Sequence, residues 1–371
     1  MTNTIYKEGI YFNMPFSEYR EIKAANRSYL EKLPEDIEEA WKVSPFNPER
    51  EEGEDTPQMK LGRAVHSAVL EPDIFCDLYV RTPRPEDFAD KTILEKNSEL
   101  SDFLVSVGEK KSGKKEELIA RALPHLDPKT HVIWDNVMSS FYSDVEDHGK
   151  TVLNDNESEI IRGIIEKLEI CDEIKEVFSK GYPEVTLIWR DEATGTLCKA
   201  RLDYVRPEAI GELKTFSYRG KKNMYKAMCD EINYNKYNAQ YVFYYNALKT
   251  LIKKVKANKA EVFGDVDKTW LEKFLENSNK QYFIVFTRTD SPFQMKAIEL
   301  KQAAIQGASD NQYYVEGLHS VKQGLALHKS FTNKAKEFES VSPKLVWRDP
   351  RQVEVLQDEH IPNVMYQNFS I

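Results

Sequence analysis

Apolar side chains recur at helical spacing in the first third of the chain. Four of them follow the i, i+4, i+7, i+8 pattern of one buried helix face: Leu61, Val65, Ala68 and Val69. A helix is therefore predicted over 58–70, and Pro72 helps to end it because proline lacks the amide that the next turn needs. Shorter helical patterns run through 16–33, and a loop rich in proline and acidic residues covers 43–58.

The centre of the chain changes to short β-rich runs that are separated by turns. Four strands are predicted there: 184–191, 196–205, 209–216 and 281–289. A run with helical spacing over 224–254 separates the third strand from the fourth, and residues 294–328 are predicted to be helical. This order predicts an α/β (α+β) fold, in which helices flank a central mixed sheet.

Polar helical patterns lie between the first long helix and the strands, and they indicate a helical insertion at about 90–150. The predicted organisation is an amino-terminal helical lead-in over 1–60 that packs on the core, a core over 61–330, and a carboxy-terminal extension over 331–371. The sequence leaves the roles of the insertion and the extension open.

Composition narrows the class of protein. Of the 371 residues, 41% are hydrophobic and 30% charged, which is enough apolar material for a core in a soluble protein. No run of about 18 apolar residues is present and the first residues lack the layout of a signal peptide, so we expect a cytoplasmic protein with no membrane partner. The four cysteines are far apart, which supports neither a disulfide framework nor a zinc ribbon.

Charge is unevenly distributed. The net charge of -9 argues against a protein coated in positive charge, but a nucleic-acid enzyme needs only a local positive field. Four basic residues without an acid lie close together: Arg219, Lys221, Lys222 and Lys226. A second basic run covers 249–259. Each run is either a solvated helix face or a surface that follows a nucleic-acid backbone.

The second and third predicted strands carry the most informative polar residues. Glu212 and Lys214 project from one face because strand side chains alternate, and an antiparallel partner can bring Asp203 beside Glu212. Two carboxylates and an ammonium in an apolar sheet are costly to bury without a compensating ion. Mg²⁺ suits such a site because it prefers carboxylate and water oxygens, and Mn²⁺ is expected to substitute. A surface hairpin with cross-strand ion pairs is the alternative.

Further residues favour a site over that alternative. His66 lies on the first long helix and becomes a candidate metal ligand if the carboxylates meet there, although a lone histidine is more often a core residue. Gln240 and Tyr244 share a helix face, and packing explains the tyrosine better than the glutamine. Glu184 begins the strand before that of Asp203 and is a second-tier candidate.

The ordered set GRAVH, EVTLIW, ARLD, GELK and QYVFY resembles the PD-(D/E)XK nuclease superfamily, and more narrowly its RecB-like branch. Together with the opening YFNMPFSEYREIKAANRSYLEKLP, it is similar to the carboxy-terminal nuclease domain of RecE (exonuclease VIII) over residues 5–290. A departure is Glu212, where that domain has aspartate.

The resemblance implies a role for each matching residue. Metal ligands would be His66, Asp203, Glu212 and the Leu213 carbonyl, and Lys214 would be the catalytic lysine beside the catalytic acids Asp203 and Glu212. The predicted DNA contacts are Gln240, Tyr244, Arg201, Arg219, Lys221 and Lys222. The scattered cysteines predict no iron–sulfur cluster.

The resemblance also implies an activity and partners. We expect a Mg²⁺-dependent 5′-to-3′ exonuclease of phage or prophage type that degrades linear double-stranded DNA from its ends. The 3′ single-stranded tails would serve recombination with a RecT-type annealing protein, and the nuclease would form a ring-like homo-oligomer. The alternatives are a catalytically inactive protein that binds DNA ends or serves assembly, a structure-specific endonuclease of the same fold, and a nuclease acting on RNA.

Overall fold

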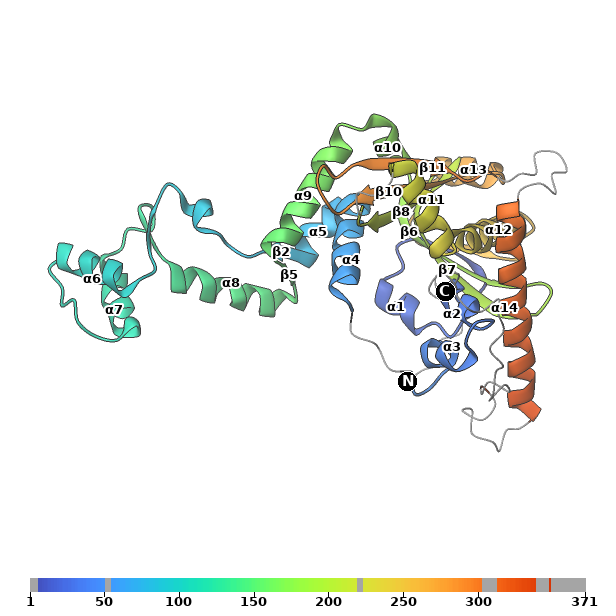
Figure 1. Cartoon of the computed structure of the whole chain (residues 1–371), viewed down its shortest axis with the longest axis horizontal. Coiled ribbons are helices and arrows are strands. Elements are labelled where there is room, and N and C mark those ends of the chain that lie inside the picture. Colours follow the sequence, from blue (N-terminus) through green and yellow to red (C-terminus); the bar gives the residue numbers. More distant parts are fainter. Residues whose placement is uncertain (1–5, 51–54, 219–222, 302–311, 338–346, 348–371) are drawn as a thin grey trace, which may run out of the picture.

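The computed structural model describes residues 6–50, 55–218, 223–301 and 312–337, together with Trp347 (Figure 1). A seven-stranded mixed sheet forms its centre, in the order β11-β10-β8-β7-β6-β1-β9. Its central strands are β6 (Tyr182–Arg190), β7 (Leu197–Val205), β8 (Ala209–Phe216) and β10 (Gln281–Arg288). Each of these corresponds to a predicted strand. The predicted α/β fold with a mixed sheet between helices is confirmed.

Three short strands at the sheet edges were not predicted. They are β1 (Gly9–Tyr11), β9 (Glu261–Phe263) and β11 (Met295–Glu299). The helix predicted over 294–328 is wrong for 295–299, because β11 pairs antiparallel with β10. The run MKAIE has little strand signal of its own, and its cross-strand neighbours decide its conformation. Residues 302–311 lie outside the described residues, and α14 (Gln312–Glu337) accounts for the rest of that prediction.

Helices cover both faces of the sheet. α12 (Tyr237–Lys256), α2 (Arg27–Lys32) and α14 pack on one face, around a core that includes Leu251 and Phe286. α4 (Pro57–Leu70) and α9 (Asp155–Glu169) pack on the other face, against Leu213. Further helices are α1 (Phe16–Glu21), α3 (Ile37–Val43), α5 (Pro72–Leu78), α10 (Asp172–Val177), α11 (Met224–Tyr234) and α13 (Lys268–Glu276). Residues on α4 and α12 therefore approach the sheet from opposite sides.

A helical arm extends away from the sheet between residues 79 and 153 (Figure 1). It begins and ends with two paired parallel strands, β2 (Tyr79–Arg81) and β5 (Thr151–Leu153). Farther out, β3 (Thr92–Leu94) and β4 (His131–Ile133) pair, and the helices are α6 (Asn97–Ser106), α7 (Lys115–Ala122) and α8 (Trp134–His148). Leu100, Leu104 and Leu118 belong to a small hydrophobic core of the arm's own. The predicted insertion is thus helical and separately packed.

The predicted carboxy-terminal extension over 331–371 is described only to residue 337 and at Trp347. Trp347 is buried and stacks on Trp41 of α3, with ring centroids 4.8 Å apart. It also stacks on Phe331 of α14, at 4.9 Å. This tryptophan therefore packs on its own chain. Across the described part of the chain, every helix is too short or too polar to cross a membrane.

Candidate metal-dependent active site

Strands β7 and β8 separate at the position of Asp203. The two strands pair at Val205↔Ile210 and Tyr204↔Gly211, and no pairing continues beyond them. The carboxylate of Asp203 lies in the gap instead, where its Oδ2 accepts a hydrogen bond of 2.8 Å from the backbone N–H of Leu213. A side chain thus takes the place of a backbone partner at this point of the sheet.

Three carboxylates lie at the same level on three neighbouring strands. The pairs Pro183↔Tyr204 and Val185↔Leu202 place Glu184 of β6 opposite Asp203 of β7. β7 and β8 are no longer hydrogen-bonded as a ladder here, but their register, extended by one residue beyond Tyr204↔Gly211, places Glu212 opposite Asp203 on its other side. The backbone of Glu184 leaves the extended conformation, with φ at 53°. An uncommon φ of this kind is often found at a functional site.

A compact group of ligand atoms forms around Asp203. Nitrogen or oxygen atoms of His66, Glu184 and Asp203 all lie within 4.8 Å of one another. His66 comes from α4, and its Nδ1 is 3.8 Å from Asp203 Oδ2. One imidazole and two carboxylates form a donor set that suits a divalent cation. Glu184, the second-tier candidate, is therefore closer to His66 and Asp203 than its place at the start of a strand indicated.

Glu212 lies beside this group, deep in the protein. Its Oε2 accepts hydrogen bonds from Gln240 Nε2 at 2.6 Å and from Lys214 Nζ at 3.2 Å. Its Oε1 is buried and has no hydrogen-bond partner among the described residues. A buried carboxylate oxygen without a partner is costly, and a cation would satisfy it. The residues present therefore fit a divalent metal.

Lys214 connects the acids. Its Nζ lies 3.2 Å from Glu212 Oε2 and 4.0 Å from Asp203 Oδ2. Burial tends to lower the pKa of Lys214, but the charges of Asp203 and Glu212 outweigh it and raise that pKa. The side chain is therefore an ammonium at neutral pH. In this state it donates hydrogen bonds and supplies positive charge rather than accepting a proton.

The carboxyl groups respond to burial in the opposite sense. Burial raises the pKa of Glu184 to about 7 and that of Glu212 to about 8, and the nearby charge of Asp203 adds to both shifts. Burial lowers the pKa of His66, which leaves a neutral imidazole that can act as a ligand. Without a cation, the site thus holds protons on groups that a cation would require to be ionised.

We expect the stabilisation of the protein by a divalent metal to increase with pH. The folded-state pKa values of Glu184 and Glu212 lie above the ordinary value of 4.5, so without metal the free energy of unfolding falls as pH rises from about 4.5 to about 8. Metal competes with these protons. Thermal unfolding with Mg²⁺ or EDTA should show a larger metal-induced rise in Tm at about pH 8 than at about pH 6. An equal rise at both pH values would contradict this assignment of the protons.

The predicted DNA contacts fall into two groups. Gln240 is 4% exposed and donates to Glu212, so its contact in this structure is with the acid. Arg201 pairs with Glu184 and donates to Met14 O at 2.8 Å. Tyr244 is half-buried and close to Glu212, whose charge adds to the effect of burial in raising the tyrosine pKa. Their contacts with DNA stay predictions. The remaining three lie outside the described residues: Arg219, Lys221 and Lys222.

The structure adds a tyrosine and an arginine that sequence reasoning missed. The ring centroid of Tyr237 lies 5.3 Å from Lys214 Nζ, an attractive cation–π arrangement. Arg27 of α2 lies 5.9 Å from the same ring and donates to Lys236 O, which ties α2 to the start of α12. No motif in the sequence marks them, because the contact depends on how α2 and α12 meet over the sheet. The Leu213 carbonyl remains a predicted ligand.

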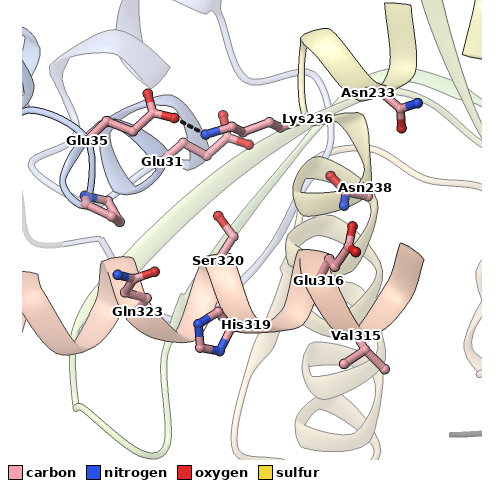
Figure 2. Close-up of a pocket in the computed structure, with 11 residues that line it drawn as sticks. Glu31, Glu35, Asn233, Lys236, Asn238, Val315, Glu316, His319, Ser320 and Gln323 are labelled. Carbon is pink, nitrogen blue, oxygen red and sulfur yellow. Dashed lines mark hydrogen bonds and ion pairs between the residues drawn. The ribbon is translucent and has the colours of Figure 1, made fainter. Parts of the chain in front are cut away.

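A separate cleft lies between α2, the α11–α12 junction and α14 (Figure 2). Its volume is about 740 Å³, and its lining includes Glu31, Glu35, Glu316 and Lys236. Lys236 pairs with Glu35, and the other two acids line the same space (Figure 2). Glu31 in turn pairs with Arg27 of α2, whose Nε lies 2.9 Å from Glu31 Oε1. None of the proposed metal ligands is among the described residues that line this cleft.

Comparisons with known proteins bear on the family of this chain. A family model described as a PDDEXK-like domain of unknown function (DUF3799) matches residues 16–326. Among solved structures, a protein of Eubacterium rectale named "Putative exonuclease" aligns with 97% of this chain and 99% of its own, at 13% identity and a TM-score of 0.40. A TM-score of this size does not by itself establish a shared fold. No curated protein matches the chain.

Proposed function

Because the chain belongs to the family of PDDEXK-like domains of unknown function (DUF3799), we propose that it is a metal-dependent deoxyribonuclease. The predicted PD-(D/E)XK superfamily is confirmed by this membership. The observation that carries the proposal is the convergence of Glu184, Asp203 and Glu212 at one level of the sheet, with His66 and Lys214 beside them. A stabilising ion-pair network does not require an imidazole there or a buried carboxylate oxygen without a partner.

The residues of the site have different proposed roles. His66, Glu184 and Asp203 would hold a divalent cation, with Glu212 and the Leu213 carbonyl as further ligands. When bound, the cation stabilises negative charge that develops on a phosphate and favours ionisation of water. Lys214 supplies an ammonium that can orient the attacking water or donate to a phosphate oxygen. Gln240 holds Glu212 by its hydrogen bond, and Tyr237 lies against Lys214.

The proposed substrate is linear double-stranded DNA, and the proposed direction is 5′ to 3′ with Mg²⁺ as the metal. The similarity of the ordered motifs to RecE-type nuclease domains supports this direction. It also supports the 3′ tails, a RecT-type annealing partner in recombination, a ring-like homo-oligomer and a phage or prophage setting in the cytoplasm. The acid-rich site supports Mg²⁺ or Mn²⁺ over softer metals.

The test compares linear and covalently closed duplex DNA of the same sequence, each with Mg²⁺, Mn²⁺ or EDTA. An exonuclease releases nucleotides from the linear form only, and end labels on either strand end report the direction. Cleavage of the closed form would favour the endonuclease alternative, and cleavage of an RNA duplex would change the substrate. Binding to DNA ends without hydrolysis under any metal would favour the inactive assembly protein.

A further inference from the structure

Helix α1 presents an aromatic side chain to solvent beside the metal-binding group. Phe16, its first residue, is 48% exposed. Its ring centroid lies 5.9 Å from the guanidinium carbon of Arg201, and that guanidinium pairs with Glu184. One side chain therefore separates the exposed ring from a proposed metal ligand. A single exposed apolar residue is ordinary on a protein surface, so only the residues around Phe16 can indicate whether it has a function.

Two basic residues of β7, the buried Lys199 and the partly buried Arg201, fix α1 in place. Lys199 is 2% exposed, and its Nζ donates to Tyr19 O and Ile22 O, both at 2.8 Å, at the end of the helix. Arg201 donates to Met14 O at 2.8 Å, just before the helix begins. Burying a cation is costly unless carbonyl oxygens or an anion compensate it. The strand thus uses the hydrogen bonds of two basic residues to hold a helix of only six residues.

The same strand carries the central acid of the site. Lys199, Arg201 and Asp203 follow one another at two-residue spacing on β7, so one rigid strand fixes both α1 and the carboxylate. The ring of Tyr19 stacks on the exposed ring of Phe16, with ring centroids 6.3 Å apart and an interplanar angle of 24°. The guanidinium carbon of Arg20 lies over the ring of Phe16, 5.8 Å from its centroid. The outer face of α1 is therefore a fixed aromatic surface with arginines next to it.

We propose that Phe16 is a stacking platform for a nucleobase of the DNA strand whose phosphate lies at the metal-binding group. Aromatic rings bind bases through their faces with little sequence preference, and the positive charge of guanidinium groups near the ring favours a polyanion. A protein partner that covers Phe16 is the competing occupant. The positive charge of the arginines near the ring favours a nucleotide over an apolar protein segment, as does the proposed metal-binding group, which would attract a phosphate once it holds a cation. This inference rests on the proposed nuclease function.

The test measures binding without hydrolysis, using the full-length protein with Ca²⁺ in place of Mg²⁺. The probes are a single-stranded oligonucleotide that contains 2-aminopurine and the same oligonucleotide with abasic sites. Phe16→Ala should weaken binding of the base-containing probe by about 10-fold and remove the quenching of its fluorescence. Binding of the abasic probe should not change, and Phe16→Trp should restore both signals. Tyr142→Ala is the control: it removes an exposed aromatic side chain of the arm, far along the chain from α1, and should leave binding unchanged.

A second pair of variants tests the support of the helix. Lys199→Met should reproduce the loss seen with Phe16→Ala, because it releases the end of α1. Lys280→Met is the matched control: Lys280 is 5% exposed and its Nζ also donates to three carbonyls, among them Phe274 O and Asn277 O, but it holds α13. Both variants should lower stability, and only Lys199→Met should lower base-dependent binding.

The outcomes separate this inference from the proposed function. If Phe16→Ala binds the base-containing probe as tightly as the wild type, the proposed stacking role of Phe16 is wrong, even if the protein hydrolyses DNA. An equal loss with the abasic probe would also overturn it, since a nucleobase would then play no part. Base-dependent binding through Phe16 by a protein that never hydrolyses DNA would support the platform and contradict the nuclease.

Discussion

Lys214→Ala should lower the rate of DNA hydrolysis by about 10²- to 10⁴-fold while the protein remains folded. Lys214 is the ammonium between Asp203 and Glu212, at 4.0 and 3.2 Å from their carboxylate oxygens. Its removal takes away the positive charge that would act on the attacking water or on a phosphate. Release of labelled nucleotides from linear duplex DNA with Mg²⁺ measures the effect.

A matched lysine controls for the loss of an ordinary ion pair. Lys254 of α12 pairs with Glu8 at 2.6 Å, and its side chain is 18% exposed, compared with 17% for Lys214. Lys254→Ala should change hydrolysis little, because an isolated pair near the surface contributes about 1 kcal/mol or less. Equal rates for the wild type and Lys214→Ala would remove this lysine from the mechanism and leave the nuclease proposal without its central donor.

Asp203→Asn should abolish both hydrolysis and the rise in Tm on adding Mg²⁺. Asp203 belongs to the group of ligand atoms within 4.8 Å and lies between Glu184 and Glu212 in the sheet. Asparagine keeps an oxygen that can accept the hydrogen bond from Leu213 but loses the charge. We expect metal affinity to fall by about 100-fold or more. Titration of Mg²⁺ followed by thermal unfolding measures this change.

The metal-free stability of the same variant distinguishes loss of a ligand from misfolding. Asp203 helps to raise the pKa of Glu184 and Glu212, so its neutralisation relieves repulsion and should leave the metal-free Tm unchanged or higher. Asp191→Asn alters a turn carboxylate that accepts a 2.8 Å hydrogen bond from Thr194 N, and it should not affect the response to metal. A full metal response by Asp203→Asn would place the cation elsewhere.

Local patterns were sufficient where a signal lies within a few neighbouring residues. Alternating and helical spacing located the four central strands and the helices of His66 and Gln240, because burial of one face imposes that spacing. The edge strand β11 was not predicted because its five residues, MKAIE, have little strand signal and acquire strand structure by pairing with β10. Glu184 was predicted only as a second-tier candidate for a related reason, since sheet register decides that it lies opposite Asp203.

The amino-acid sequence alone determined the types of the central elements, the chemistry of the candidate residues and their order along the chain, since these depend on side-chain periodicity and identity. Tertiary structure decided which of those residues meet. The spacing predicted that Asp203 can lie beside Glu212, and both acids do lie around Lys214 Nζ. The spacing did not predict that β7 and β8 part there and that Asp203 accepts a hydrogen bond from the backbone of Leu213. His66 of α4 lies near Asp203, and Gln240 of α12 donates to the neighbouring Glu212 from the opposite side of the sheet. Local spacing cannot encode where β7 and β8 part, because the separation of two strands arises from contacts between residues distant in the chain.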